Sequence, residues 1–225
     1  GLKYDIFSFN CESLQELEVL NSLAKEEDRT ANVSIRLNPN VEAKTHRYIT
    51  TGLNENKFGI TIDKLPQLFS ALPNLSHLKL TGIHFHIGSQ ITDLKPFIDL
   101  CEKAEVVQEI FEKAGHSLQH INVGGGYGIN YAEPDTDPIP DFKAFFEVFE
   151  KKLNLRQGQQ LHFELGRSIV GQCGSLISRI LYIKEGIQTN FAVLDAGMTE
   201  LIRPALYQAK HRVDSLTSNR PAKVY

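Results

Sequence analysis

The sequence has few cysteines and no long apolar run. Its three cysteines, Cys11, Cys101 and Cys173, are widely spaced and form no C-x-x-C pair, which argues against a disulfide framework or a zinc site. We therefore expect a protein of the reducing cytoplasm that holds no metal. No apolar stretch approaches the roughly 20 residues that a membrane-spanning helix needs, and no charged-then-apolar leader opens the chain, so we expect no membrane association.

Charge of either sign is not concentrated anywhere along the chain. The formal net charge is -3 and there is no block of lysine or arginine, which disfavours nucleic acid or an anionic membrane as a partner and favours a small-molecule ligand. The 225 residues are 41% hydrophobic and 23% charged. This is the balance of an ordinary globular protein with a sizeable core, and it excludes disordered and fibrous classes.

Short apolar runs alternate with helical patterns through most of the chain. Buried strands are expected at residues 5–10, 32–37, 78–86, 120–123 and 160–164, and helices at 13–25, 61–71, 94–114 and 141–153. Ser13 and Glu16 form a possible capping box at the first helix. The alternation predicts repeated βα units around a parallel sheet. A doubly wound sheet and a (β/α)₈ barrel both satisfy it.

The pattern changes after Ser168. Residues 173–183 and 191–194 have the composition of strands, and a short polar turn replaces the amphipathic helix between them, which is typical of a β-hairpin. We therefore expect a domain boundary near residues 168–171. Residues 1–170 would form the βα domain, and residues 171–225 would begin an all-β domain.

Residues suited to chemistry gather where the expected strands end: His84, His86, Gly88, Ser89 and Gln90 after one strand, Gly124, Gly125 and Gly126 after the next, and Glu164, Gly166 and Arg167 after a third. In parallel βα folds this edge of the sheet carries the functional site. Consecutive glycines expose backbone N–H groups to an anion, and a serine and an arginine add donors, so the set describes a phosphate cradle. A structural turn explains a glycine run about as often, and Ser89 could simply cap a helix.

Glu164 and the histidine pair each allow two interpretations. A carboxylate at the end of an apolar strand needs a cationic or protonated partner. A protonated pyridine nitrogen is one candidate, and an ion pair with Arg167 is the alternative. His84 and His86 share one face of a strand, but a metal is disfavoured because no third ligand lies at the usual spacing. Stacking on an aromatic cofactor or a hydrogen-bonded core histidine fits better.

Nine short strings together resemble one enzyme family in their order and spacing. The family is that of the diaminopimelate decarboxylases, within the alanine-racemase-like, fold-type III pyridoxal-phosphate enzymes, and the resemblance covers essentially the whole chain. The strings are Ser34–Pro39, Thr45–His46, Thr51–Gly52, Lys57–Gly59, His84–Gln90, Gly124–Gly126, Glu164–Arg167, Asp195–Met198 and Arg203–Tyr207.

The resemblance implies an eight-stranded TIM-like (β/α)₈ barrel, of which this chain holds the fourth to eighth strands, followed by the start of a β-domain, in a homodimer. It implies the cofactor pyridoxal 5'-phosphate and the decarboxylation of meso-2,6-diaminopimelate to L-lysine. His86 would stack on the cofactor ring and Glu164 would pair with the pyridine nitrogen. The phosphate would be held by Ser89, Gly126, Gly166 and Arg167, and the substrate by Arg167, Arg203 and Tyr207.

The chain also departs from the family pattern. The lysine that forms the Schiff base, in a Tyr-x-x-Lys-Ala-Asn-like motif, has no counterpart, because Lys3, Lys25 and Lys57 lie in other contexts. A late Cys-Glu motif and a cofactor-contacting tyrosine are expected beyond Tyr225. We therefore expect no catalytic residue for these steps and no turnover in this chain alone. An ornithine or arginine decarboxylase and a non-catalytic pyridoxal-phosphate-binding relative stay open as alternatives.

Overall fold

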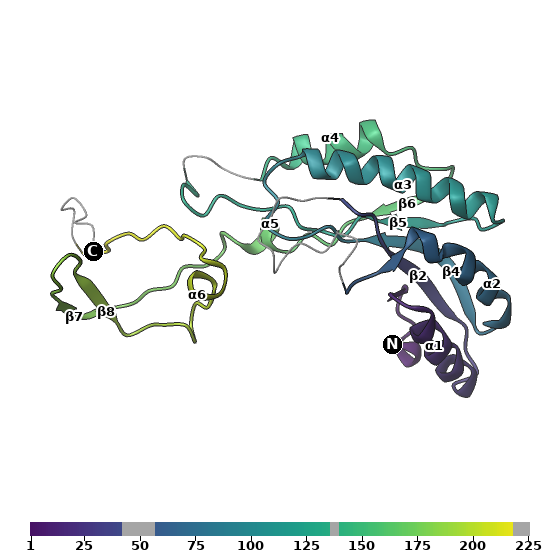
Figure 1. Cartoon of the computed structure of the whole chain (residues 1–225), viewed down its shortest axis with the longest axis horizontal. Helices are drawn as coiled ribbons and strands as arrows, with labels where there is room; N and C mark the ends of the chain where they lie inside the picture. Colours follow the sequence, from purple (N-terminus) through teal and green to yellow (C-terminus); the bar gives the residue numbers. More distant parts are fainter. Residues whose placement is uncertain (42–56, 136–139, 218–225) are drawn as a thin grey trace.

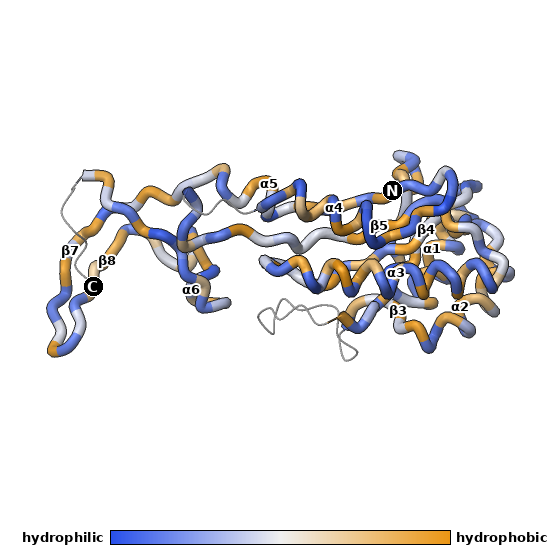
Figure 2. Tube along the Cα trace, turned by 90° about the horizontal axis from the view of Figure 1, so that it is seen from above, coloured by the Kyte–Doolittle hydropathy of each residue, from blue (hydrophilic) through white to orange (hydrophobic). Residues whose placement is uncertain are grey.

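The computed structural model describes residues 1–41, 57–135 and 140–217. Two of the nine family-like strings, Thr45–His46 and Thr51–Gly52, lie outside these residues. The described chain is elongated: a parallel sheet with its helices forms one end, and a β-hairpin lies at the other (Figures 1 and 2).

The main sheet is parallel and follows the order of the chain. Its strands are β1 (Phe9–Cys11), β2 (Ala31–Asn38), β4 (Leu78–Phe85), β5 (His120–Asn122) and β6 (Gln160–His162). A short strand, β3 (Ile60–Thr61), pairs with the end of β2. The predicted parallel α/β architecture is confirmed. Within the described residues the sheet is open, with β1 and β6 at its edges.

Helices follow the strands as the sequence predicts, with the bounds α1 (Leu14–Glu26), α2 (Leu65–Ala71), α3 (Lys95–Lys113) and α4 (Phe142–Lys152), and 3₁₀ turns at η1 (Leu2–Tyr4), η2 (Ile62–Lys64) and η3 (Leu72–Asn74). The capping interaction at α1 is confirmed, because Ser13 Oγ accepts a hydrogen bond from the Glu16 N–H at 3.1 Å. The Glu16 carboxylate accepts in return from the N–H of Glu12, at 2.6 Å. The helix therefore begins where these side chains satisfy its free N–H groups.

The two faces of the sheet differ in chemistry because successive side chains of a strand point to opposite sides. One face packs against the helices and is almost completely buried; it carries Val33, Ile35, Leu37, Ile83, Phe85, Ile121 and Val123. The alternating positions on the other face are polar: Ser34, Arg36, His84, His120, Asn122 and His162. The apolar face holds the fold together, and the polar face is left for hydrogen bonding and ligand chemistry.

An aromatic cluster on the apolar side supports the loop that follows β5. The ring of Tyr127 stacks on Phe145 of α4, with centroids 4.7 Å apart, and Phe97 of α3 meets Phe145 edge to face at 5.0 Å. The Tyr127 hydroxyl also accepts from the N–H of Asp141, the residue that caps α4. Packing of α3 and α4 thus fixes the position of the glycine loop directly before Tyr127.

The rest of the chain leaves the sheet through the short helix α5 (Arg167–Val170) and forms an antiparallel hairpin of β7 (Ile180–Lys184) and β8 (Phe191–Leu194). The hairpin was predicted, but its first strand begins at residue 180 and not at 173. Apolar residues recur along this part in Figure 2, and every residue of β7 is exposed. After α6 (Arg203–Tyr207) the chain returns to the loop after β5, where Arg212 N–H donates to the carbonyl of Tyr131.

Candidate active site

Three loops meet at the carboxyl-terminal edge of the sheet. The N–H of Ile91, after β4, donates to the carbonyl of Gly126, after β5, at 2.9 Å. The N–H of Glu164, after β6, donates to the carbonyl of Gly124 at 2.7 Å. The three groups of residues that the sequence places at strand ends are therefore brought together as expected.

The glycine run is required by its own packing. A Cβ on Gly124 would lie 2.3 Å from the carbonyl oxygen of Phe85, and one on Gly126 would lie 2.4 Å from that of Gly88. A Cβ on Gly125 would lie 2.2 Å from the carbonyl oxygen of Glu164. Gly124 and Gly126 also have positive φ angles, which other residues rarely adopt. The structural explanation of the run therefore holds whether or not a ligand binds there.

Gly166 is different. Its φ angle is -114°, which any residue adopts, and a Cβ placed on it would meet no atom within 4 Å. Neither backbone conformation nor packing requires a glycine here. The missing side chain instead leaves open space beside Arg167, which allows a ligand to approach the backbone closely.

The Glu164 carboxylate is held by side chains from three other strands or strand ends. Asn122 Nδ2 donates to Oε1 at 2.8 Å, and His84 Nε2 lies 3.2 Å from Oε2. Asn10 Nδ2 lies 3.4 Å from Oε1. The hydrogen bond from His84 is the main reason why the pKa of Glu164 falls to about 2, although partial burial opposes the fall. Glu164 is therefore a carboxylate at neutral pH.

The alternative interpretation, an ion pair between Glu164 and Arg167, is not what the structure shows. Among the described residues, Arg167 donates to the Tyr131 hydroxyl at 2.8 Å and to Ser89 Oγ at 3.2 Å, and the carboxylate has the partners given above. Ser89 thus lies beside a guanidinium group and not at the start of a helix. Glu164 and Arg167 are three residues apart in sequence, but their side chains belong to two separate groups of contacts.

His86 contacts the glycine loop. Its Nδ1 atom accepts from the N–H of Gly125 at 3.4 Å. Burial and the positive charge of Arg36 hold the pKa of His86 below its ordinary value, so the ring is neutral at physiological pH. Arg36 itself is paired with Glu12 at 2.6 Å.

Two arginines meet at the aromatic ring of Tyr131. The guanidinium carbon of Arg203 lies 4.7 Å from the ring centroid, and that of Arg167 lies 5.8 Å from it. Arg203 also lies 5.7 Å from the ring of Tyr207, and His211 packs edge to face on Tyr131 at 4.6 Å. Burial and the charge of Arg167 lower the pKa of Arg203. Arg203 is therefore half-buried and lies with Arg167 at the ring of Tyr131.

Several buried polar atoms near this aromatic cluster have no hydrogen-bond partner within the described part of the chain. They include Nε of Arg167, Oγ of Ser168, Nε of Arg203 and Nε2 of His211. Unpaired buried donors are costly, and two guanidinium groups with no carboxylate between them attract anions. The arrangement therefore fits bound anions such as a phosphate and a carboxylate, while Glu164 fits a cationic group.

Sequence reasoning did not identify several members of the site. Asn10 and Asn122 hold Glu164, Tyr131 joins the two arginines, and His211 closes the cluster. The asparagines could have been found, because each occupies a polar position near the end of an otherwise apolar strand. Tyr131 and His211 lie in irregular segments and carry no comparable signal.

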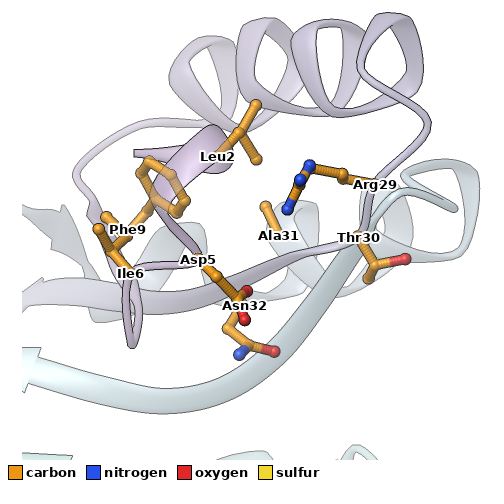
Figure 3. Close-up of a pocket in the computed structure, with 8 residues that line it drawn as sticks. All are labelled: Leu2, Asp5, Ile6, Phe9, Arg29, Thr30, Ala31 and Asn32. Carbon is orange, nitrogen blue, oxygen red and sulfur yellow. The ribbon is translucent and has the colours of Figure 1, made fainter.

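A hollow elsewhere on the molecule has a different character. It is lined by Leu2, Asp5, Ile6, Phe9 and residues 29–32 (Figure 3). These residues lie around the start of β2, whereas the polar cluster lies beyond the strand ends. We assign the chemistry to the polar cluster, because the hollow brings together no set of hydrogen-bonded acids, bases or arginines.

Residues 1–41, 57–135 and 140–217 contain neither a candidate membrane span nor a candidate metal cluster. No helix there is long and apolar enough to cross a membrane. No group of three or more histidine, cysteine, aspartate or glutamate side chains there could hold a metal ion.

The fold and site define a class of protein: a parallel α/β domain with an anion cradle and a carboxylate at the carboxyl ends of its strands. Residues 2–171 match the family model described as pyridoxal-dependent decarboxylase, pyridoxal binding domain. The chain belongs to this family of pyridoxal-dependent decarboxylases.

Similar proteins and solved structures agree with this family assignment. A diaminopimelate decarboxylase of Bacteroides thetaiotaomicron is 52% identical over 225 residues, which are 100% of this chain and 58% of that protein. The crystal structure of diaminopimelate decarboxylase from Helicobacter pylori complexed with L-lysine aligns with a TM-score of 0.85 at 36% identity, and covers 93% of this chain and 52% of that one. A lysine/ornithine decarboxylase from Vibrio vulnificus, at 19% identity and a TM-score of 0.74, shares the fold alone. The chain thus spans little more than half the length of its relatives.

Proposed function

We propose that this chain is the cofactor-binding part of a diaminopimelate decarboxylase, which converts meso-2,6-diaminopimelate to L-lysine with pyridoxal 5'-phosphate. The observation that carries the proposal is the pairing of two opposite sites at one sheet edge: the hydrogen-bonded carboxylate of Glu164, and the guanidinium groups of Arg167 and Arg203, which form no ion pair within the described residues. Pyridoxal phosphate and a dicarboxylic amino acid complement both. The 52% identity with the Bacteroides enzyme supports the same substrate.

The phosphate end of the cofactor is assigned to Ser89, Gly126, Gly166 and Arg167. Arg167 already donates to Ser89 Oγ, and its Nε atom is buried without a partner. Gly166 leaves open space beside it. A phosphate bound here would gain charge-assisted hydrogen bonds and would satisfy the orphaned donor.

The ring end is assigned to His86 and Glu164. The neutral ring of His86 would stack on the aromatic ring, and the Glu164 carboxylate would hold a proton on the ring nitrogen. The cofactor supplies an electron sink for the pair of electrons left when carbon dioxide departs. Glu164 strengthens this sink because a protonated ring nitrogen withdraws electrons more strongly.

The substrate's distal carboxylate is assigned to Arg203 with Tyr207, next to Arg167. A guanidinium group binds a carboxylate through two parallel hydrogen bonds. This assignment also separates the proposal from its nearest rival. After decarboxylation ornithine and arginine leave no carboxylate to bind, whereas diaminopimelate keeps one, which suits a second arginine in the site.

The organisation of the whole protein is proposed on the same grounds. Residues 1–170 would be part of a barrel and residues 171–225 the start of a β-domain, supported by the parallel sheet and the hairpin that follows it. We further propose a homodimer, as the family resemblance implies, located in the reducing cytoplasm that the widely spaced cysteines favour. The rival from another class is a non-catalytic pyridoxal-phosphate-binding relative.

Carbon dioxide release from meso-diaminopimelate, L-ornithine and L-arginine by the full-length protein tests the proposal. We expect kcat/KM to be far higher for meso-diaminopimelate. Comparable release from ornithine or arginine would move the protein to the rival enzyme class. Tight cofactor binding with no release from any of the three would favour the non-catalytic relative.

A further inference from the structure

The hydrogen bond from His84 is the largest cause of the lowered pKa of Glu164. His84 lies on β4, and its side chain is only 4% exposed. Its Nε2 atom is 3.2 Å from Glu164 Oε2. Its Nδ1 atom is buried and has no hydrogen-bond partner among the residues that the structure describes.

These contacts indicate which nitrogen atoms of the imidazole carry a proton. The bond to a carboxylate oxygen requires a proton on Nε2. A second proton on Nδ1 would bury an N–H group with no acceptor, which is strongly unfavourable, whereas an unpaired lone pair is better tolerated. His84 therefore donates from Nε2 as a neutral ring.

Among the described residues, no lysine or arginine forms an ion pair with the carboxylate. Asn122 is oriented by its own contact, since its Oδ1 accepts from the N–H of Gly124 at 2.8 Å while its Nδ2 faces Glu164. Arg36, the nearest strong cation on the neighbouring strand β2, is paired with Glu12. Burial keeps the His86 ring neutral.

We infer that His84 is a positioning residue, which holds the Glu164 carboxylate in place as a neutral Nε2–H donor and so reserves its negative charge for the protonated ring nitrogen of the cofactor. This inference rests on the proposed function. A cation at position 84 would pair with Glu164 and compete with the ring nitrogen. A non-donor would leave the carboxylate free to move.

The test compares two ligands of the full-length protein without turnover: pyridoxamine 5'-phosphate and its 1-deaza analogue, in which carbon replaces the ring nitrogen. The ratio of their dissociation constants reports the nitrogen contact alone, because both carry the same phosphate. His84→Leu should lower the preference for the nitrogen ligand by about tenfold, the size expected for one hydrogen bond to a charged group. His84→Lys should lower it further, and His84→Gln, which keeps a neutral donor, should restore it.

Two control variants distinguish a wrong role for His84 from a wrong role for Glu164. His162→Gln changes another histidine of the polar face, whose hydrogen bond goes to Gln160, and should leave the ratio unchanged. If Glu164→Gln also leaves the ratio unchanged, the proposed role of Glu164 is wrong. If Glu164→Gln abolishes the preference while His84→Leu and His84→Lys keep it, the inference about His84 alone is overturned.

A measurement on the unmodified cofactor-free protein covers the case in which the variants do not fold. Nitrogen-15 NMR of labelled histidine distinguishes an Nε2–H ring, an Nδ1–H ring and an imidazolium, and the His84 signals are assigned by through-bond correlation. We expect the neutral Nε2–H form at pH 7. An imidazolium or an Nδ1–H form would contradict the inference.

Discussion

The backbone carbonyl oxygen of Glu164 occupies the space that a side chain on Gly125 would need, with only 2.2 Å between that oxygen and the Cβ position. The β5 loop and the end of β6 are thus in direct backbone contact. Any side chain at residue 125 must push apart the segment to which we assign phosphate binding and the segment that carries the Glu164 carboxylate.

Gly125→Ala and Gly166→Ala should therefore have different effects. The first should destabilise the fold, and the second should weaken ligand binding. We expect Gly125→Ala to lower the free energy of unfolding by about 2 kcal/mol, as overpacking of a fixed backbone does. Gly166→Ala should change it by less than about 1 kcal/mol but should weaken binding of pyridoxamine 5'-phosphate. Thermal unfolding and ligand titration measure the two effects. Equal loss of stability in both variants would remove the argument that Gly166 leaves space for a ligand.

Tyr131 should contribute separately through its hydroxyl and its ring. Tyr131→Phe removes the acceptor of Arg167 and should weaken cofactor binding by up to about tenfold, as for one lost hydrogen bond. Tyr131→Leu also removes the ring beneath Arg203, so the KM for meso-diaminopimelate should rise in addition. Measuring the dissociation constant of the cofactor and the KM of the substrate for both variants tests these separate effects. A rise in KM already complete in Tyr131→Phe would contradict the separate role of the ring.

Arg203→Gln should raise the KM for meso-diaminopimelate without weakening cofactor binding, because the phosphate is assigned to Arg167. The matched control is Arg212→Gln, which removes an arginine that is already paired with Asp135 and Asp214. Steady-state kinetics of the full-length protein give the comparison. A similar rise in KM for both variants would show that Arg203 acts only through general charge.

Acid should destabilise the fold through His120 before it affects Glu164. His120 is buried against His162 and bonded to Ser34 Oγ at 2.7 Å, and burial lowers its pKa from 6.5 to about 4. The unfolded chain therefore binds this proton more readily, so stability is complete above pH 6.5 and is lost as the pH falls toward 4. The loss has an upper bound of about 3 kcal/mol. Glu164, whose pKa is also lowered, adds a loss only below pH 4.5.

Urea unfolding between pH 8 and pH 4 measures this dependence, with His77→Gln as a control for a histidine that is only partly buried. A flat profile between pH 6.5 and pH 4 in the wild-type protein would contradict the assignment to His120.

Much of the fold could be predicted from the sequence because its signals are local. Strands β2, β4, β5 and β6 and helices α1 to α4 follow from apolar runs and periodicity, and Ser13 marks the start of α1 correctly. The short elements β3, α5 and α6 were missed, because two to five residues carry no periodicity. The strands were interpreted as simply buried, although the alternation in His84-Phe85-His86 already indicates one polar and one apolar face.

Individual residues of the candidate site could be predicted from the sequence, but the contacts between their side chains could not. Ser89, Glu164 and Arg167 were identified, but the expected alternative of a Glu164–Arg167 ion pair failed because their side chains have other partners. Spacing along the chain cannot give the contacts of Arg167 with Tyr131 or of Glu164 with Asn10. Those depend on the order of the strands in the sheet.

The most direct test of the central claim is Glu164→Gln in the full-length protein, with kcat and the dissociation constant of the cofactor measured on the same preparation. The account predicts that kcat falls by at least about a hundredfold while cofactor affinity changes far less, because the phosphate donors remain and the electron sink weakens. A variant with near-normal kcat, or one whose only defect is loss of cofactor, would contradict it.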